Sequence, residues 1–202
     1  MLLGNNKNEW NWFVSFAELA SGKPLVAADY EKVLTGPLGA EVAAKAVAQY
    51  PAAGFPSPSE AAGAAMTSQA FFCPARRVMR WAGKHVPIYS YEFLDTTAPQ
   101  YFEPVSYPYG AAHTLEIQYI FPKYHGARGK VNPLNPEQQK LSDAMVKYWA
   151  AFATKGEPAV PGQPAWPRWS AENEQTLLLN IPQITVAKDS GVDRKCEFWD
   201  AL

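Results

Sequence analysis

Hydrophobic and polar positions alternate in this chain with the periods of both helices and strands. Residues 39–50 are rich in alanine, place apolar residues at helical spacing and stop at Pro51. Residues 59–81 are also compatible with a helix, and Pro74 is expected to start a new helix there or to bend this one. The clearest helix is predicted over residues 136–155.

That helix has end signals in addition to its periodicity. Asn135 is a favourable N-cap, Pro136 suits the first helical position, and Gly156 suits the end. Its apolar stripe consists of Leu141, Met145, Tyr148, Trp149 and Phe152.

Strand patterns occur near the start, the middle and the end of the chain. Residues 1–6 resemble the last part of a strand that enters a turn, residues 86–93 are β-branched and aromatic, and residues 176–179 are nearly all leucine. Strands, helices and long loops in this order predict an α/β fold, with a mostly parallel sheet flanked by helices. This length supplies about half a sheet, so we expect that a preceding polypeptide completes it.

Composition and charge narrow the class of protein. The 202 residues are 48% hydrophobic, which suits one domain or a large piece of one. A net charge of −1 and a pI near 6.3 give no reason to expect nucleic acid as a partner. The sequence has no apolar run of about 18 residues, so no membrane span is expected, and residues 1–6 do not resemble a signal peptide.

The histidines are the first candidates for acid–base chemistry. Of His85, His113 and His125, His113 is best placed, because small residues at 110–112 let its loop pass close to a substrate. The loop follows the strand predicted over 86–93, and a helix-compatible run follows the histidine. A general base is best placed on such a loop, held by rigid elements on both sides.

A catalytic histidine also needs a carboxylate on its second ring nitrogen. Glu9 follows the opening strand, in the kind of loop that borders the ligand crevice of α/β sheets. Alternatively, Glu9 caps a helix over residues 10–16 or adds a negative charge to its first turn, and the residues alone favour this second interpretation. The sequence contains no Gly-x-Ser-x-Gly elbow, Cys-x-x-Cys pair or glycine-rich phosphate loop, and we expect neither a metal nor a cofactor.

Several blocks, taken in order, resemble the type-B carboxylesterases, the family that includes the cholinesterases. Gly110-Ala111-Ala112-His113-Thr114-Leu115-Glu116 resembles the family's Gly-x-x-His-x-x-Glu block, and residues 2–10 resemble the segment that carries its catalytic acid. The other matching blocks are 72–74, 88–93, 148–158, 166–167 and 196–200. The resemblance covers essentially the whole chain and implies that residues 1–202 are the C-terminal part of one α/β-hydrolase domain.

The resemblance implies hydrolysis of carboxylic esters through a Ser-Glu-His triad, with Glu9 as the acid and His113 as the base. The serine and the oxyanion donors would lie in the family's N-terminal portion, which would then be this chain's partner, in the same polypeptide or as a separate chain. We therefore expect this chain alone to be inactive. It departs from the family at Asn8, where an acid is usual, and at Trp10, where glycine is usual.

Two cysteines and three aromatic residues complete the candidate residues. The sequence alone leaves open whether Cys73 and Cys196 are buried free thiols. The resemblance implies a disulfide between them, and with it a secreted or periplasmic protein; a cytoplasmic one is the alternative. Phe102, Tyr107 and Tyr109 precede the histidine, and they either line a substrate pocket or, as we favour, anchor their loop.

Two other functions remain open at this point. The family also contains adhesion proteins that keep the fold and lose the triad, although the presence of both Glu9 and His113 argues against that function. An inactive truncated fragment is the third possibility, and it would expose unpaired strand edges.

Overall fold

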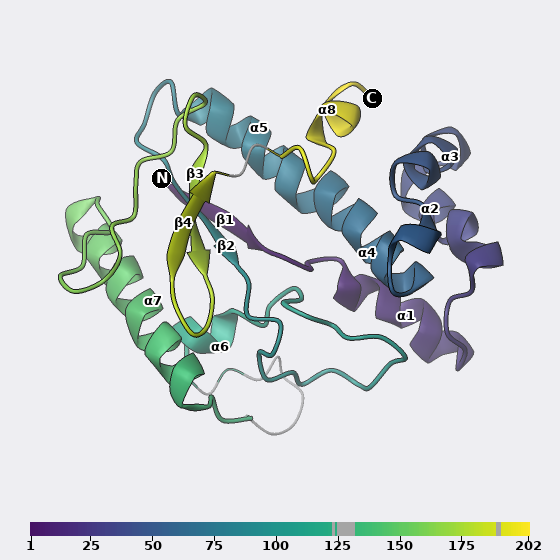
Figure 1. The fold of residues 1–202 in the computed structure, drawn as a ribbon, viewed down its shortest axis with the longest axis horizontal. Coiled ribbons are helices and arrows are strands. Elements are labelled where there is room, and N and C mark those ends of the chain that lie inside the picture. Colours follow the sequence, from purple (N-terminus) through teal and green to yellow (C-terminus); the bar gives the residue numbers. More distant parts are fainter. Residues whose placement is uncertain (123, 125–131, 189–190) are drawn as a thin grey trace.

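A twisted, mostly parallel sheet lies at the centre of the computed structural model, which describes residues 1–122, 124, 132–188 and 191–202. Within this part of the chain the strand order is β1 (Leu2–Asn6), β2 (Tyr89–Phe93), β3 (Gln175–Leu179) and β4 (Thr185–Lys188). The first three strands are parallel to one another, and β4 runs antiparallel to β3 (Figure 1).

Helices connect the strands and cover both faces of the sheet (Figure 1). Between β1 and β2 lie α1 (Asn11–Ser21), α2 (Tyr30–Leu38), α3 (Ala40–Gln49), α4 (Pro58–Thr67) and α5 (Cys73–Ala82), with short 3₁₀ turns at Ala27–Asp29 and Ala52–Gly54. A π-helical segment, η3 (Ser68–Phe72), joins α4 to α5. After β2 come α6 (Ile117–Ile120) and α7 (Pro136–Lys155), and α8 (Cys196–Asp200) follows β4.

The helix predicted over 136–155 is confirmed as α7. Asn135 caps it in a reciprocal arrangement, because its side chain accepts the backbone N–H of Gln138 while the Gln138 side chain accepts the backbone N–H of Asn135. The helix predicted over 59–81 is also present. Its turns widen at η3, just before Pro74, whose ring would collide with the carbonyl four residues earlier in a regular α-helix.

The strand predicted over 86–93 begins later than expected, at Tyr89. Pro87 has no N–H to donate, which limits extension of the ladder in that direction. Its carbonyl accepts a bond from the amino group of Met1, and Ile88 pairs only through an isolated bridge with Trp169. The opening strand and the strand near 176–179 are confirmed as β1 and β3.

The two faces of the sheet pack against different helices. Tyr89 and Phe93 of β2, together with Leu177 and Leu179 of β3, share a buried cluster with α6 and α7. Leu3 and Ile88 instead pack with Met79 and Ala82 of α5. A fold with helices on both faces suits strands that are apolar on both sides. No helix in the described ranges is both long and apolar enough to span a membrane.

A buried aspartate joins the end of β2 to the two helices that follow it. Asp95 is 1% exposed and accepts the hydroxyl of Tyr119 on α6 at 2.5 Å and the amide of Gln138 on α7 at 3.1 Å. It also accepts the backbone N–H and the hydroxyl of Thr97. The Asp95 carboxylate thus bonds side chains from both helices and fixes α6 and α7 relative to β2.

A disulfide ties the last helix to the start of α5. Cys73 and Cys196 are bonded, with Cα atoms 5.3 Å apart and both residues at most 1% exposed. This is the pairing that the resemblance implies. Trp199 of α8 reinforces the attachment, because its indole N–H donates to the Tyr50 hydroxyl.

Candidate active site

Glu9 and His113 meet at the edge of the sheet where the parallel strands end. Glu9 follows β1 and His113 lies in the loop after β2, and these two strands are neighbours in register, with Asn6 opposite Phe93. The carboxyl ends of neighbouring parallel strands lie at the same edge of a sheet. Although they are 104 positions apart, Oε2 of Glu9 lies 2.7 Å from Nδ1 of His113.

Glu9 does not cap the helix that follows it. The α1 helix begins at Asn11 and has no side-chain cap, so the alternative interpretation of Glu9 as a helix cap is wrong. The Glu9 side chain is 7% exposed, and its second oxygen, Oε1, accepts the backbone N–H of Asn6 at 2.7 Å. Both oxygens are therefore bonded, which fixes the direction in which the carboxylate faces the histidine.

The loops that carry the two residues are joined by backbone bonds. Asn8 donates its N–H to the carbonyl of Ala111 at 3.0 Å, and its side-chain oxygen accepts the Ala111 N–H at 3.2 Å. Gly110 has a φ of 64°, and a Cβ there would lie 2.5 Å from that Asn8 oxygen. Asn8, where the family usually has an acid, thus has a structural use here, and glycine at 110 permits the close approach.

His113 is held in an electrostatic environment that favours its charged form. The hydrogen bond with Glu9 raises the pKa of His113 above its ordinary value of 6.5, against the opposing effect of burial. The next residue, Thr114, has a φ of 74°, which is rare for a β-branched residue. The Thr114 hydroxyl bonds the Tyr101 hydroxyl. Such strained backbone is found preferentially at functional sites.

Three aromatic rings that the sequence analysis did not single out surround the histidine. Trp12 stacks on the His113 ring with centroids 5.9 Å apart, and Phe13 and Phe71 lie at 5.3 and 5.4 Å. Trp12 and Phe13 follow Glu9 on α1, and Phe71 lies in η3. In the sequence, these rings are indicated only by the aromatic residues three and four positions after Glu9, and that pattern is equally typical of the buried face of a helix.

Comparison with known proteins identifies the family. The sequence pattern of the carboxylesterase family matches residues 1–199. The chain belongs to the carboxylesterase family. The acylcarnitine hydrolase of Mus musculus is 36% identical over 131 residues, which are 64% of this chain and 22% of that protein. The cocaine esterase of Homo sapiens is 34% identical over 135 residues, 66% of this chain and 23% of that protein.

A solved structure supports the same fold. The chain is similar to PNB esterase with a TM-score of 0.66 and 24% identity, over 96% of this chain and 37% of that one. At this identity the likeness shows the α/β-hydrolase fold alone. The chain spans about a quarter of the length of the two curated relatives named above.

The three aromatic residues before the histidine occupy two different environments in this carboxylesterase chain. Phe102 and Tyr109 line an apolar cavity of about 180 Å³ together with Trp12, the residue that stacks on His113. Tyr107 lies outside that cavity lining and donates its hydroxyl to the carbonyl of Asn11 at 2.6 Å. The Tyr109 hydroxyl donates to the carbonyl of Glu103, so both tyrosines also hold backbone in place.

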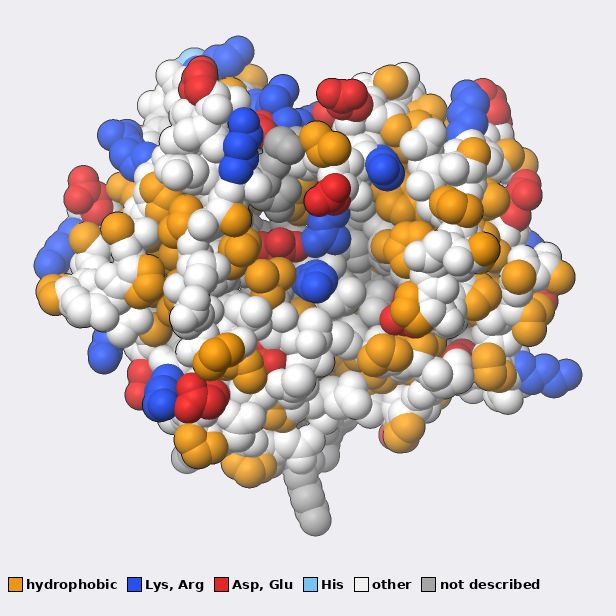
Figure 2. Space-filling view, in the orientation of Figure 1, with side chains coloured by type: hydrophobic (Ala, Val, Ile, Leu, Met, Phe, Trp, Pro, Cys, Tyr) orange, Lys and Arg blue, Asp and Glu red, His pale blue; other side chains and the backbone are white. Residues whose placement is uncertain are grey.

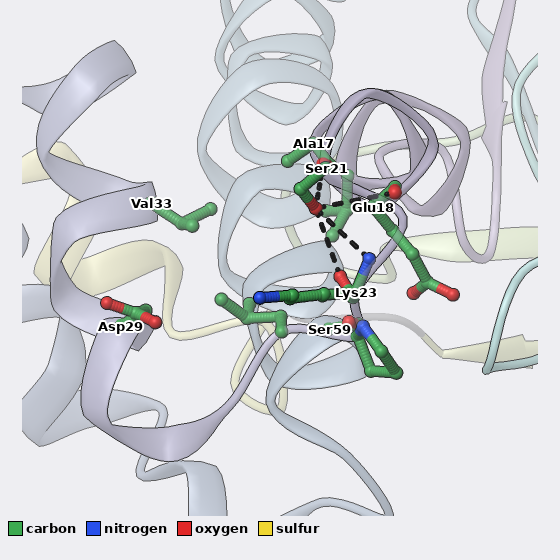
Figure 3. Close-up of a pocket in the computed structure, with 10 residues that line it drawn as sticks. Ala17, Glu18, Ser21, Lys23, Asp29, Val33 and Ser59 are labelled. Carbon is green, nitrogen blue, oxygen red and sulfur yellow. Dashed lines mark hydrogen bonds between the residues drawn. The ribbon is translucent and has the colours of Figure 1, made fainter.

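Neither the cavity of about 180 Å³ nor either of two further hollows is lined by Glu9 or His113; the cavity adjoins the histidine through Trp12. One hollow, of about 190 Å³, lies between α1, α2 and the start of α4, where Ser21 makes local bonds at the end of α1 (Figure 3). The other, of about 540 Å³, includes Lys7, Glu92 and Arg194 in its lining. Basic and acidic side chains alternate around the hollowed centre of the face in Figure 2. The mixed charges of these two linings give no preference for one class of ligand.

His85 lies away from this site, because it is exposed and packs near Trp81 at the end of α5. His125 lies outside the described residues. Within the described ranges, no group of three or more histidine, cysteine, aspartate or glutamate side chains is arranged to hold a metal ion.

Proposed function

We propose that this chain supplies the acid and the base of a Ser-Glu-His triad in a carboxylic ester hydrolase, with Glu9 as the acid and His113 as the base. The observation that carries the proposal is the 2.7 Å contact between Glu9 Oε2 and His113 Nδ1, which lie on loops after neighbouring parallel strands. Membership of the carboxylesterase family supports the reaction class.

The geometry suits the roles of the acid and the base in such a triad. The Glu9 carboxylate accepts the Nδ1 proton and fixes the tautomer in which Nε2 is the base. Nε2 makes no hydrogen bond with another residue in the part of the chain that the structure describes, and the His113 side chain is 34% exposed. Nε2 would take the proton of the serine hydroxyl as it attacks the ester carbonyl and then donate it to the departing alcohol. Loss of the alcohol leaves the acyl group on the serine; Nε2 would then take a proton from a water molecule that attacks this acyl-serine ester and return the proton to the serine oxygen as the acid is released.

The nucleophile is proposed to come from polypeptide beyond these 202 residues. The sequence has no Gly-x-Ser-x-Gly elbow, and the curated relatives named above are more than four times as long as the matched segment. Without the serine and the oxyanion donors, a triad keeps almost none of its catalytic power. We therefore propose that the chain alone is inactive and that the N-terminal portion of an esterase is its partner.

The surroundings of His113 favour an ester with an apolar group. Trp12, Phe13 and Phe71 lie within 6 Å of the imidazole, and the neighbouring cavity is lined mainly by aromatic and aliphatic side chains. Burying an alkyl or aryl group against such rings is favourable by about 25 cal/mol per Å² of apolar surface. Phe102 and Tyr109 are proposed as part of this pocket. Tyr107 is proposed as a loop anchor.

The experiment compares His113→Ala and Glu9→Gln with the unchanged complete esterase on 4-nitrophenyl esters of increasing chain length. Both variants should lose roughly 1,000-fold or more in kcat. His85→Ala is the matched control, because it removes an exposed histidine elsewhere and should leave turnover unchanged. Turnover that survives His113→Ala would refute the proposal.

A second experiment addresses the chain by itself and its location. The isolated chain should hydrolyse the same esters only at the background rate, and adding the N-terminal portion should restore turnover. The disulfide between Cys73 and Cys196 further supports export, since such bonds persist in oxidising compartments. Fractionating the producing cells and locating the chain by antibody would test this; recovery solely from the cytosol would contradict it.

A further inference from the structure

We propose that Asn6 is a positioning residue that holds the acid and the base of the triad together, with the partly buried Glu116 as its partner. The proposal rests on the proposed function of Glu9 and His113 and adds to it the residues that keep those two in place. Asn6 is the last residue of β1 and is 2% exposed, so it acts from beneath the site and does not touch the substrate.

Asn6 uses every one of its N–H groups on the two catalytic loops. Its backbone N–H donates to Oε1 of Glu9 at 2.7 Å. Its side-chain amide donates one bond to the carbonyl of Ala112 at 2.8 Å and another to the carboxylate of Glu116. The first bond orients the acid, and the other two hold residues on both sides of His113.

Glu116 is suited to be the second anchor because it is acidic and partly buried. Burial raises the pKa of the Glu116 carboxyl above its ordinary value of 4.5, while the bond from Asn6 opposes that rise. A carboxylate that is partly removed from water is stabilised by a donor, which the amide of Asn6 supplies. Glu116 also sits three residues after His113, beyond the strained Thr114, so fixing it limits movement of the base.

The residue type at position 6 follows from these contacts. Two side-chain donors are needed at one point, and an amide nitrogen supplies two while a hydroxyl supplies one. Aspartate has the same shape but no donor, and it would add a third carboxylate beside Glu9 and Glu116. Asparagine therefore satisfies both acceptors and keeps the charge of the site unchanged.

The test uses Asn6→Ala and Asn6→Asp in the complete esterase. Both should lower kcat by about 100-fold, which a displacement of about 1 Å between catalytic groups can cause, while KM stays close to that of the unchanged enzyme. Asn6→Ala keeps the backbone N–H that Glu9 accepts but loses the side-chain bonds to Ala112 and Glu116. His113 should then be held less firmly against Glu9, so its pKa, followed by NMR of labelled histidine, should fall toward 6.5. Asn132→Asp is the control, since Asn132 donates a similar bond to the carbonyl of Gln100 at an exposed position.

Variants of Glu116 provide a second test should the changes at Asn6 prevent folding. Glu116→Leu removes the acceptor and should lower kcat in the same way, whereas Glu116→Gln keeps an oxygen for the Asn6 amide and should lose less. The double variant Asn6→Ala/Glu116→Leu should be no worse than the poorer single variant, because both changes remove the same bond.

The outcomes separate this proposal from the function on which it rests. If Asn6→Ala lowers the midpoint of unfolding but leaves kcat and the pKa of His113 unchanged, Asn6 is only structural and the proposal is overturned. If His113→Ala keeps its activity, the triad assignment fails. The NMR titration of His113 would still report whether the Asn6 side chain holds His113 against Glu9, because that readout does not depend on turnover.

Discussion

The disulfide between Cys73 and Cys196 should account for a large share of the stability of this chain. The perturbation is the double substitution Cys73→Ala/Cys196→Ala, which removes the bond without leaving a reactive thiol. Both cysteines belong to the same buried cluster, at the junction of α5 with the C-terminal helix α8. Without the bond, α8 is held mainly by Trp199 and by the exposed ion pair of Arg77 with Asp200.

The size of the effect follows from the length of the loop that the bond closes. The two cysteines are 123 positions apart. A loop of that length loses chain entropy in the unfolded state equivalent to about 5 kcal/mol at 25 °C. Residual structure in the unfolded chain reduces this figure, so we expect a measured loss of about 3–5 kcal/mol. That is a large fraction of the roughly 5–15 kcal/mol that stabilises an ordinary domain.

The assay is urea unfolding of the complete esterase with and without the bond, followed by tryptophan fluorescence. Trp199 packs beside the disulfide and reports on that region directly. Because the two cysteines are at most 1% exposed, dithiothreitol should reduce the bond only after denaturant is added. A loss below about 1 kcal/mol, or two free thiols in the denatured, non-reduced protein, would refute the reasoning.

Three further predictions concern the site and its support. Glu9→Gln should move the acidic limb of the pH–rate profile to lower pH, because it weakens the bond that raises the pKa of His113 and the imidazole then stays neutral at lower pH. An unmoved acidic limb would count against Glu9 as the partner of His113. Tyr119→Phe removes a bond to a buried aspartate carboxylate and should cost about 1.5–3 kcal/mol in thermal or urea unfolding, whereas a neutral result would show that the network tolerates its loss. Gly110→Ala should lower both the free energy of unfolding and kcat more than Gly162→Ala does. Both glycines have a positive φ, but only at position 110 would a Cβ lie 2.5 Å from a side-chain oxygen, that of Asn8 on the opposite loop. Equal effects of the two substitutions would contradict the close approach.

Elements with signals at both ends could be predicted from the sequence. The α7 helix has a cap, a proline at its first position and a glycine after its last turn, and its observed bounds match the prediction. The α2 helix was missed because Gly36 and Pro37 interrupt its pattern; Pro37 is the last residue but one of α2, so almost no helix has to continue beyond it. The β4 strand was missed because its four residues are only partly buried and obtain their order from pairing with β3.

The candidate site is harder to predict from residues alone because its parts are far apart in the chain. Nothing in the spacing of Glu9 and His113 requires them to meet; their contact depends on β1 and β2 being parallel neighbours. The family resemblance supplied that pairing, whereas local pattern favoured a helix cap for Glu9. The role proposed for Asn6 has no local signal at all, since its three bonds reach residues 3, 106 and 110 positions away.

Strands β1 and β2 end opposite each other, so the distance between Glu9 and His113 does not depend on most of the chain between them. Asn6 and Phe93 lie opposite each other, and Lys7 donates its N–H to the carbonyl of Phe93 at 3.0 Å, so the two loops leave the sheet at the same height. The segment from α2 to α3 does not enter this junction. Grafting or lengthening that segment should therefore leave the geometry of the Glu9–His113 pair intact, which makes it a suitable place to vary the sequence.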